Sequence, residues 1–391
     1  MKEVVIKKFA TKDKGQAASK KELKTGCTKV QELNSNKPIT CIETCAGYGT
    51  TRLALEEAGA RLGIPINCIA MSEIDKTAIR AYQALHGKMH NIGDMTKADW
   101  KQWSTFVLSV TFPCQSISQA NNKKSGKGFE KGANNKSSIV WSLEQILKDM
   151  PQKPRLILFE NVAAILNKKN KPTLDKLVAY LESVGYKVVY KKLDAQDYGI
   201  PQHRERVFIL AMLDKEMDFQ WPEPIKLPFY LRDVLEKNPD PKYNLTEKAK
   251  KGFIERAFRF EHPEKDTYPF RVHNPSKADV AFTISTKSGG RNYDNFVWEH
   301  DVSDDKFVKV CEKGLEKTSL DLETVKNTTI RKLTPKEVMT LTGLTDEQQE
   351  KLKNFSPAQI FKLMGNGIVV PVLTEVLYQY LKAMKEAGKL N

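Results

Sequence analysis

Short apolar runs alternate with stretches of helical spacing in the first half of the chain. The helical spacing predicts helices over residues 51–59 and 76–86. Continuous apolar runs between turn residues predict strands over residues 39–46, 67–72, 106–111, 155–159, 186–193 and 206–212. This alternation is typical of an α/β fold whose doubly wound parallel sheet is covered by helices on both faces.

The pattern changes along the chain, and each change suggests a boundary. Residues 1–37 lack apolar periodicity and carry ten Lys against four acidic residues, a net charge of +6, so we expect a basic arm. Residues 38–213 form the predicted α/β domain. Residues 214–330 are rich in Pro, Lys and aromatic residues and predict a smaller second domain. Apolar helical spacing returns in residues 331–391, which we expect to lead back to the first domain.

The composition narrows the class of protein. The 391 residues include 63 Lys and Arg against 48 Asp and Glu, a net charge of +15, which favours a polyanionic partner such as nucleic acid. No apolar run approaches the roughly 18 residues of a membrane span, and the first residues lack the apolar core of a secretory signal. We therefore expect an intracellular protein with no membrane partner. Six cysteines without repeated close pairing do not predict a disulfide framework.

A glycine-containing loop and two acidic residues follow the first predicted strands. In the loop, glycines let the backbone approach a ligand near a helix N-terminus. Glu73 comes 24 residues after Gly49 and could hold ribose hydroxyls, and Asp94 could meet an adenine amine. Each acid could equally be a helix cap or a surface residue. Together they predict a nucleoside cofactor, with binding residues Cys45, Ala46, Gly47, Tyr48, Gly49, Glu73, Ile74, Asp94 and Met95.

A cysteine follows the third apolar strand, in Phe112-Pro113-Cys114-Gln115. At a strand exit, we expect the Cys114 thiol to be presented outward, where nearby positive charge would favour its thiolate. The loop at residues 119–138 has five Lys and one Glu, a net charge of +4, and predicts a basic flap beside this nucleophile. A purely structural cysteine is the alternative.

Two further motifs end or begin predicted strands. In Phe159-Glu160-Asn161, burial could raise the pKa of the Glu160 carboxyl so that it acts as an acid. In Gln202-His203-Arg204-Glu205-Arg206, two arginines lie two residues apart and face one side of an extended strand. Their guanidinium groups suit a phosphate or a base carbonyl. A surface acid and a structural salt bridge are the alternatives.

The order of these motifs resembles that of the DNA (cytosine-5)-methyltransferases of bacterial or phage type, from residue 39 to residue 381. The segments 330–337 and 365–370 complete the likeness. The resemblance implies a Rossmann-like, S-adenosylmethionine-dependent methyltransferase domain with a smaller, mixed target-recognition domain, acting on duplex DNA. It implies that Cys114 adds to carbon 6 of a flipped-out cytosine, that Glu160 contacts N3 and the exocyclic amine, and that Arg204 holds O2 and favours the thiolate. It adds Asn366 to the cofactor site.

The resemblance also implies which residues touch DNA. These are Gln115, Ser118, Lys136, Gln202 and Arg206 near the nucleophile and, in the recognition region, Lys287 and Arg291. The chain departs from the family at Thr50, where many relatives carry Gly, at Gly365, where Ser or Ala is common, and at Lys136, where we expect Arg.

Other interpretations stay open at this point. A transfer-RNA cytosine-5 methyltransferase would use the same motifs, and an inactive DNA-binding regulator could keep the same fold. His86 and His90 have helical i, i+4 spacing, but no Cys/His pair at zinc spacing accompanies them, so we predict no metal. We expect a monomer in the cytoplasm of a prokaryotic cell or a phage-infected host.

Overall fold

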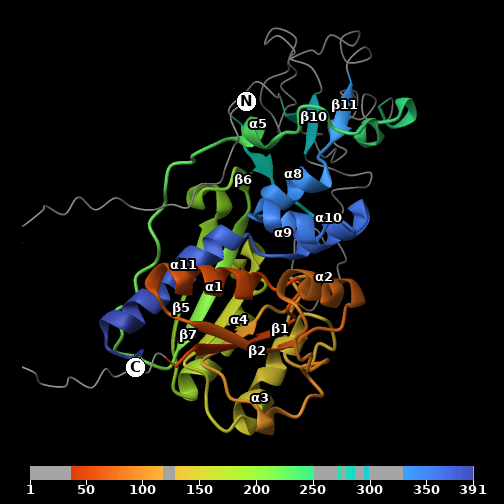
Figure 1. Cartoon of the computed structure of the whole chain (residues 1–391). Helices are drawn as coiled ribbons and strands as arrows, with labels where there is room; N and C mark the ends of the chain where they lie inside the picture. The colour runs from red at the N-terminus through yellow and green to blue at the C-terminus, as the bar shows by residue number, and fades with distance from the viewer. Residues whose placement is uncertain are drawn as a thin grey trace, which may run out of the picture.

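A six-stranded sheet lies at the centre of the protein (Figure 1). The computed structural model describes residues 37–117, 128–250, 272–273, 279–286, 295–298 and 329–390. The strand order is β2-β1-β3-β4-β7-β5. In chain order the strands are β1 (Ile39–Thr44), β2 (Ile66–Ser72), β3 (Val107–Val110), β4 (Leu156–Val162), β5 (Lys187–Asp194) and β7 (Glu205–Met212), which confirms the six predicted strands.

The sheet is mixed, and the prediction of an all-parallel sheet was wrong at β7. β1 pairs in parallel with β2 and β3, and β3 pairs in parallel with β4. β7 runs antiparallel to both β4 and β5. Only residues 195–204 connect β5 to β7, too few for the crossover that a parallel neighbour needs, so the chain turns back beside β5.

Helices cover both faces of the sheet (Figure 1). Alternate strand residues point to opposite faces: Cys41 packs with the first group of helices and Ile42 with the second. The first group is α1 (Thr50–Leu62), α2 (Lys76–His86) and α11 (Val370–Glu386), and the second is α3 (Leu143–Asp149) and α4 (Lys171–Ser183). The two predicted helices are confirmed.

Helix α11 brings the C-terminal part of the chain back onto the sheet. It packs along α1, where Arg61 pairs with Glu375 at 2.6 Å. Pro371 lies in its first turn, where the missing amide hydrogen costs no hydrogen bond within the helix. By length and composition alone, the stretch Pro357–Glu386 could cross a membrane, but 67% of its apolar window is buried within the protein, as in a core helix.

A smaller group of elements lies beside the edge of the large sheet. Three strands, β8 (Val272–His273), β10 (Phe296–Trp298) and β11 (Ile330–Lys332), form one sheet, and β6 (Gln202–His203) pairs with β9 (Ala281–Phe282). The helices here are α5 (Leu231–Val234), α8 (Pro335–Thr340), α9 (Asp346–Lys351) and α10 (Pro357–Asn366).

Local hydrogen bonds fix the ends of these helices. Thr334 begins α8 with a capping box in which its hydroxyl accepts from the amide of Glu337.

Short 3₁₀ helices complete the described fold: η1 (Trp100–Gln102), η2 (Ser138–Ser142), η3 (Ala163–Leu166), η4 (Ala195–Tyr198) and η5 (Pro241–Tyr243). The boundaries that we assigned to the arm and the domains stay predictions.

Candidate active site

The glycine-containing loop leaves β1 and enters α1 with unusual backbone angles. Cys45, Gly47 and Gly49 all have positive φ, at 50°, 59° and 86°. A Cβ at Gly49 would lie 2.3 Å from Nε2 of His86, so glycine is required there. A Cβ at Gly47 would meet no atom within 4 Å. The loop therefore presents its backbone to open space, as a cradle for a ligand must.

The carboxylate of Glu73 faces this loop from the end of β2. Its Oε2 accepts the amide of Gly47 at 2.9 Å, and its Oε1 accepts the amides of Ile74 and Asp75, each at 2.8 Å. A carboxylate has about four acceptor positions, so one that already accepts from these amides can still accept a hydrogen bond from a sugar hydroxyl. Ile74, beside it, is 73% exposed, so an apolar surface lies next to this carboxylate.

Asp94 and Met95 complete one wall of this region. Oδ1 of Asp94 accepts from the amide and the hydroxyl of Thr96 at 3.0 and 2.7 Å. These hydrogen bonds lower the pKa of Asp94, so it is charged at neutral pH. Met95 is buried, and its sulfur lies 4.0 Å from the sulfur of Cys45. The predicted cofactor residues from the loop after β1, the end of β2 and the segment before β3 thus lie together at one edge of the sheet.

Tyr48 and Asn366 connect the loop with the end of α10. The Tyr48 side chain is buried, and its ring lies so close to Gly367 that a Cβ there would be 2.5 Å from Cε1. Ala46 is also buried, whereas Asn366 is exposed at the last turn of α10. Tyr48 therefore shapes the wall by packing, and of these three residues only Asn366 offers a side-chain amide to a ligand.

The predicted nucleophile lies just beyond β3. Cys114 is partly exposed, and its carbonyl accepts the amide of Ile117 at 2.9 Å in a tight turn. Asn161, at the end of β4, donates its side-chain amide to the carbonyl of Phe112 at 3.1 Å and so holds the start of this segment. We assigned Asn161 no role from the sequence, although a buried amide next to Glu160 was an available signal.

Glu160 and Arg206 form an ion pair beside the cysteine. Nε of Arg206 lies 3.1 Å from Oε1 of Glu160, and both side chains are largely buried. Burial raises the pKa of Glu160, and the charges of Arg206 and Arg204 oppose that rise. The prediction of a carboxyl with a raised pKa at this position is confirmed in direction.

The thiol of Cys114 has a raised pKa. Burial is the main cause, the charge of Glu160 adds to it, and the charges of Arg206 and Arg204 act in the opposite direction. The expected positive charge is present, but it does not outweigh burial. The thiol is therefore protonated until something changes the balance of charge around it.

Arg204 is used differently from the prediction. Its Nη1 donates to the carbonyl of Ile284 at 2.6 Å, and its Nη2 donates to the carbonyls of Gly365 and Gly367 at 3.0 and 2.6 Å. Burial and the neighbouring Arg206 lower the pKa of Arg204 to about 9. Because main-chain carbonyls occupy both ends of its guanidinium fork, Arg204 joins three segments of the protein rather than presenting that fork to a base.

Gln202 also differs from the prediction. It is fully buried, its Nε2 donates to the carbonyl of Leu341 at 2.6 Å, and its Oε1 accepts the amide of Ile284 at 2.9 Å. A buried side chain with both ends of its amide bonded cannot reach DNA, so the sequence-based assignment was wrong. The motif was identified correctly, but its first residue and first arginine organise the fold.

The remaining predicted DNA contacts divide into two groups. Gln115, within the nucleophile turn, and Lys136, next to Ser137 in sequence, are exposed. Ser118, Lys287 and Arg291 lie outside the described residues, as does most of the basic arm.

The two histidines with helical spacing do not share a site. Nε2 of His86 lies 3.2 Å from the carbonyl oxygen of Tyr48, and burial lowers the pKa of His86 to about 4. The ring of His90 instead packs on Trp103 at 5.2 Å between centroids. Within the ranges that the structure describes, no three His, Cys, Asp or Glu residues form a group able to hold a metal ion.

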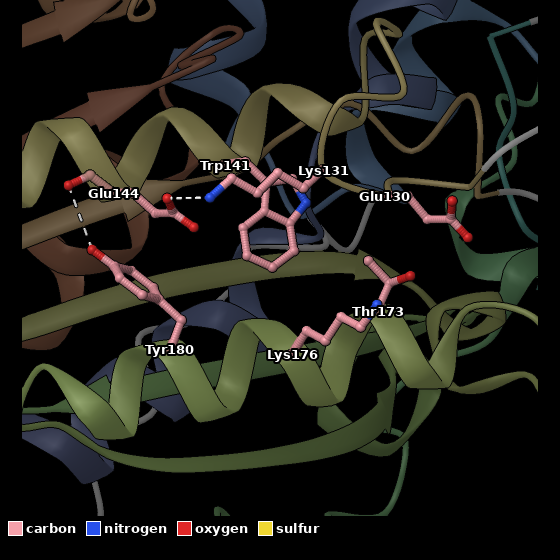
Figure 2. A pocket seen from close by; sticks show the side chains of 7 residues that line it. All are labelled: Glu130, Lys131, Trp141, Glu144, Thr173, Lys176 and Tyr180. Atoms are coloured by element: carbon pink, nitrogen blue, oxygen red, sulfur yellow. Dashed lines mark hydrogen bonds and ion pairs between the residues drawn. The ribbon is translucent and has the colours of Figure 1, made fainter.

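One cavity, of about 380 Å³, lies away from the thiol between α4 and the segment that enters α3 (Figure 2). Lys131 pairs with Glu144 across it, and the ring of Trp141 forms part of its wall. It contains none of the predicted site residues. Its lining residues are Glu130, Lys131, Trp141, Glu144, Thr173, Lys176 and Tyr180.

The fold and the site define a class of enzyme. A Rossmann-like sheet with an antiparallel β7, a glycine-containing loop after β1 and an acidic residue after β2 is the architecture of S-adenosylmethionine-dependent methyltransferases. Two solved structures share the fold over most of both chains. A methyltransferase of Entamoeba histolytica, EhMeth, has a TM-score of 0.67 at 17% identity, covering 90% of this chain and 99% of that one. The Dnmt2 methyltransferase of S. pombe has a TM-score of 0.65 at 18% identity, with 88% and 99% covered.

Sequence comparison identifies the family within this class. The model of the C-5 cytosine-specific DNA methylases matches residues 39–382. The Type II methyltransferase M.NlaX of Neisseria lactamica is 32% identical over 344 residues, which are 88% of this chain and 96% of that protein. The chain belongs to the C-5 cytosine-specific DNA methylase family, as the order of its motifs predicts. It is a DNA (cytosine-5)-methyltransferase that uses S-adenosylmethionine.

Proposed function

We propose that the protein methylates carbon 5 of a cytosine flipped out of a specific duplex DNA sequence, through a covalent bond between Cys114 and carbon 6. The observation that supports this most is the grouping of Cys114 with the Glu160–Arg206 pair at the sheet edge that also carries the Gly47–Glu73 contact. Flipping makes the stacked base accessible and costs roughly a few kcal/mol.

The cysteine overcomes the low reactivity of the base. Carbon 5 of cytosine is a poor nucleophile, and addition of the Cys114 thiolate to carbon 6 converts the ring to an enamine. A new Sγ–C6 bond forms, and the displaced electron pair moves towards N3 and O2. Once carbon 5 carries the methyl group that the bound cofactor would supply, loss of the carbon 5 proton to water and expulsion of the Cys114 thiolate would restore the aromatic ring.

Glu160 and Arg206 would stabilise the negative charge that this addition creates on N3 and O2 of the base. Glu160, whose pKa is raised, can hold or supply a proton at N3 and accept from the exocyclic amine. We assign the base carbonyl O2 to Arg206 because it lies beside Glu160, whereas the fork of Arg204 is bonded to three carbonyls. Arg204 then supports catalysis by holding the surrounding segments.

The residues at the carboxyl edges of β1 and β2 fit S-adenosylmethionine. Glu73 would hold the ribose hydroxyls, Ile74 would cover one face of the adenine, and Asp94 would accept from its amine. The open backbone at Gly47 and the amide of Asn366 would contact the rest of the molecule. When bound, this cofactor supplies an electrophilic methyl group on a sulfonium.

DNA would lie between the large domain (residues 38–213) and the recognition domain (residues 214–330). Gln115 and Lys136 are exposed beside the nucleophile and are the described candidates for filling the gap in the duplex and holding phosphate. The Type II methyltransferases among the relatives suggest a partner restriction enzyme in a prokaryotic or phage-infected cytoplasm. We expect the protein to act as a monomer.

Methylation of two polymers tests this function. The full chain is incubated with S-adenosylmethionine that is radiolabelled in its methyl group. The substrate is either duplex DNA that contains many different sequences or a pool of transfer RNAs. We expect label in DNA, and we expect Cys114→Ala to abolish labelling while duplex binding is retained. Labelling of RNA alone, or labelling of DNA by the alanine variant, would contradict the proposal.

A further inference from the structure

Ser137 bridges Pro113 and Ser116, which lie on either side of Cys114 in the nucleophile turn. Its hydroxyl donates to the carbonyl of Pro113 at 2.6 Å and accepts the amide of Ser116 at 3.2 Å. Ser137 itself is completely buried. One side chain from a segment more than 20 residues away thus closes a ring of hydrogen bonds around the nucleophile.

Ser137 is held in place by its own segment. Its amide donates to Oδ1 of Asn135 at 2.9 Å, and Nδ2 of Asn135 donates to the carbonyl of Gly128 at 3.0 Å. The indole of Trp141, at the wall of the cavity in Figure 2, donates to the carbonyl of Phe129 at 2.8 Å. Because both sides of the segment are tied down, the Ser137 hydroxyl is a fixed reference point for the turn.

From this bridge we propose that Ser137 is a positioning residue for the thiol of Cys114. The inference rests on the proposed role of Cys114 as the nucleophile. Without the hydroxyl, the carbonyl of Pro113 and the amide of Ser116 lose their shared partner, and the turn can relax. Misplacement of a reacting atom by about 1 Å can cost on the order of 100-fold in rate. The side chain acts through the turn and does not touch the base.

Ser138 offers a matched control in the same turn. Its hydroxyl donates to the carbonyl of Asn135 at 2.9 Å and accepts the amide of Asn135 at 3.2 Å, and no hydrogen bond joins it to the nucleophile turn within the described part of the chain. Removing this hydroxyl perturbs the local turn without breaking the bridge. A difference between the two serines therefore isolates the bridge from general loosening.

The test measures the rate at which Cys114 forms a covalent adduct with duplex DNA containing 5-fluorocytosine at the target site, with saturating DNA and S-adenosylmethionine. We expect Ser137→Ala to slow adduct formation about 10- to 100-fold, with dissociation constants for DNA and cofactor within about threefold of wild type. Ser138→Ala should form the adduct at close to the wild-type rate. If Ser137→Ala does not fold, the same comparison is made with Ser137→Gly.

Each outcome has a defined meaning. A wild-type adduct rate in the folded variant that lacks the Ser137 hydroxyl overturns the proposal, and so does equal slowing by Ser138→Ala. A selective loss of affinity for DNA or cofactor at an unchanged adduct rate also overturns it. If wild-type protein forms no Cys114 adduct at all, the proposed function fails instead.

Discussion

The guanidinium of Arg206 lies 3.1 Å from the carboxylate of Glu160, and the two charges act on the thiol of Cys114 in opposite directions. Burial is the main cause of the raised pKa of the thiol, the carboxylate adds to that rise, and the guanidinium opposes it. In the free protein the nucleophile is therefore kept protonated. A base that engages Glu160 through N3 would weaken one of the two causes of that protonation, so binding and activation are linked.

Neutralising Glu160 should activate the thiol and impair the enzyme at the same time. Glu160→Gln removes a negative charge beside Cys114, so the pKa of the thiol falls and its alkylation by iodoacetamide at pH 7.5 becomes faster, by roughly 3- to 10-fold. Methylation should fall by about 100-fold or more because an amide cannot supply a proton to N3. Mass spectrometry of the Cys114 peptide measures alkylation against pH.

Arg206→Met should have the opposite effect on the pKa of the Cys114 thiol. Loss of this positive charge should raise the pKa of the thiol further and slow alkylation at the same pH. If Glu160→Gln and Arg206→Met both changed the alkylation rate of Cys114 in the same direction, the electrostatic explanation would be contradicted.

A buried carboxyl below the glycine-containing loop should make stability depend on pH. Burial raises the pKa of Glu43 to about 7, although the hydroxyl of Tyr82 donates to it at 2.8 Å. Because the folded pKa exceeds the unfolded value of 4.5, this stability is complete below pH 4.5 and is lost as the pH rises through 7. Glu43→Gln should remove that loss, which amounts to about 3 kcal/mol.

Denaturant unfolding at pH 5 and pH 8 measures this effect. The difference in unfolding free energy between Glu43→Gln and wild type should grow in favour of the variant as the pH rises. The exposed Glu57→Gln serves as the control and should show no such trend. Parallel pH profiles for Glu43→Gln and wild type would refute the prediction.

Gly365 permits a close contact between α10 and the segment at residues 284–286. A Cβ at Gly365 would lie 2.3 Å from the amide nitrogen of Thr286, a backbone atom that cannot simply turn away. Gly365→Ala should therefore destabilise the protein by about 1–3 kcal/mol and disturb the carbonyls that bind Arg204. We expect weaker duplex binding in a filter or gel assay, and wild-type stability together with wild-type affinity would show that the contact is unimportant.

The buried pair of Arg331 and Glu337 anchors β11 to α8. Two hydrogen bonds of 2.9 and 2.8 Å join them, and Glu337 also accepts the amide of Glu236. Arg331→Met leaves a buried charge unpaired and should cost about 3–5 kcal/mol of unfolding free energy. The double change Arg331→Met with Glu337→Gln should cost less than the two single changes together.

The exposed pair of Lys353 and Glu350 is the comparison for this prediction. Lys353→Met should change the unfolding free energy by less than about 0.5 kcal/mol, because both partners face water. If Arg331→Met and Lys353→Met lowered the unfolding free energy equally, the stabilising role of the buried Arg331–Glu337 pair would be contradicted.

The sequence predicted the strands of the large sheet well because apolar runs report burial directly. The direction of β7 was the main error in the fold. An apolar run does not reveal in which direction its strand runs. The direction of β7 could have been inferred from the short connection at residues 195–204, which excludes a crossover.

The sequence could not distinguish the roles of the two arginines in the Gln202–Arg206 motif. Both have the same chemistry, and their spacing predicted that they face the same way, but Ile284, Gly365 and Gly367, distant in sequence, bring three carbonyls to Arg204. The bridge from Ser137 to the nucleophile turn likewise joins positions whose proximity no local pattern reveals.

Trapping on duplex DNA that contains 5-fluorocytosine tests the central claim most directly, because fluorine at carbon 5 prevents the release that follows methyl transfer. With S-adenosylmethionine present, the wild-type chain should form a denaturation-resistant complex with the DNA, joined through Cys114. The complex should be absent with Cys114→Ala. A complex that forms without Cys114, or no complex from a protein that methylates DNA, would contradict the account.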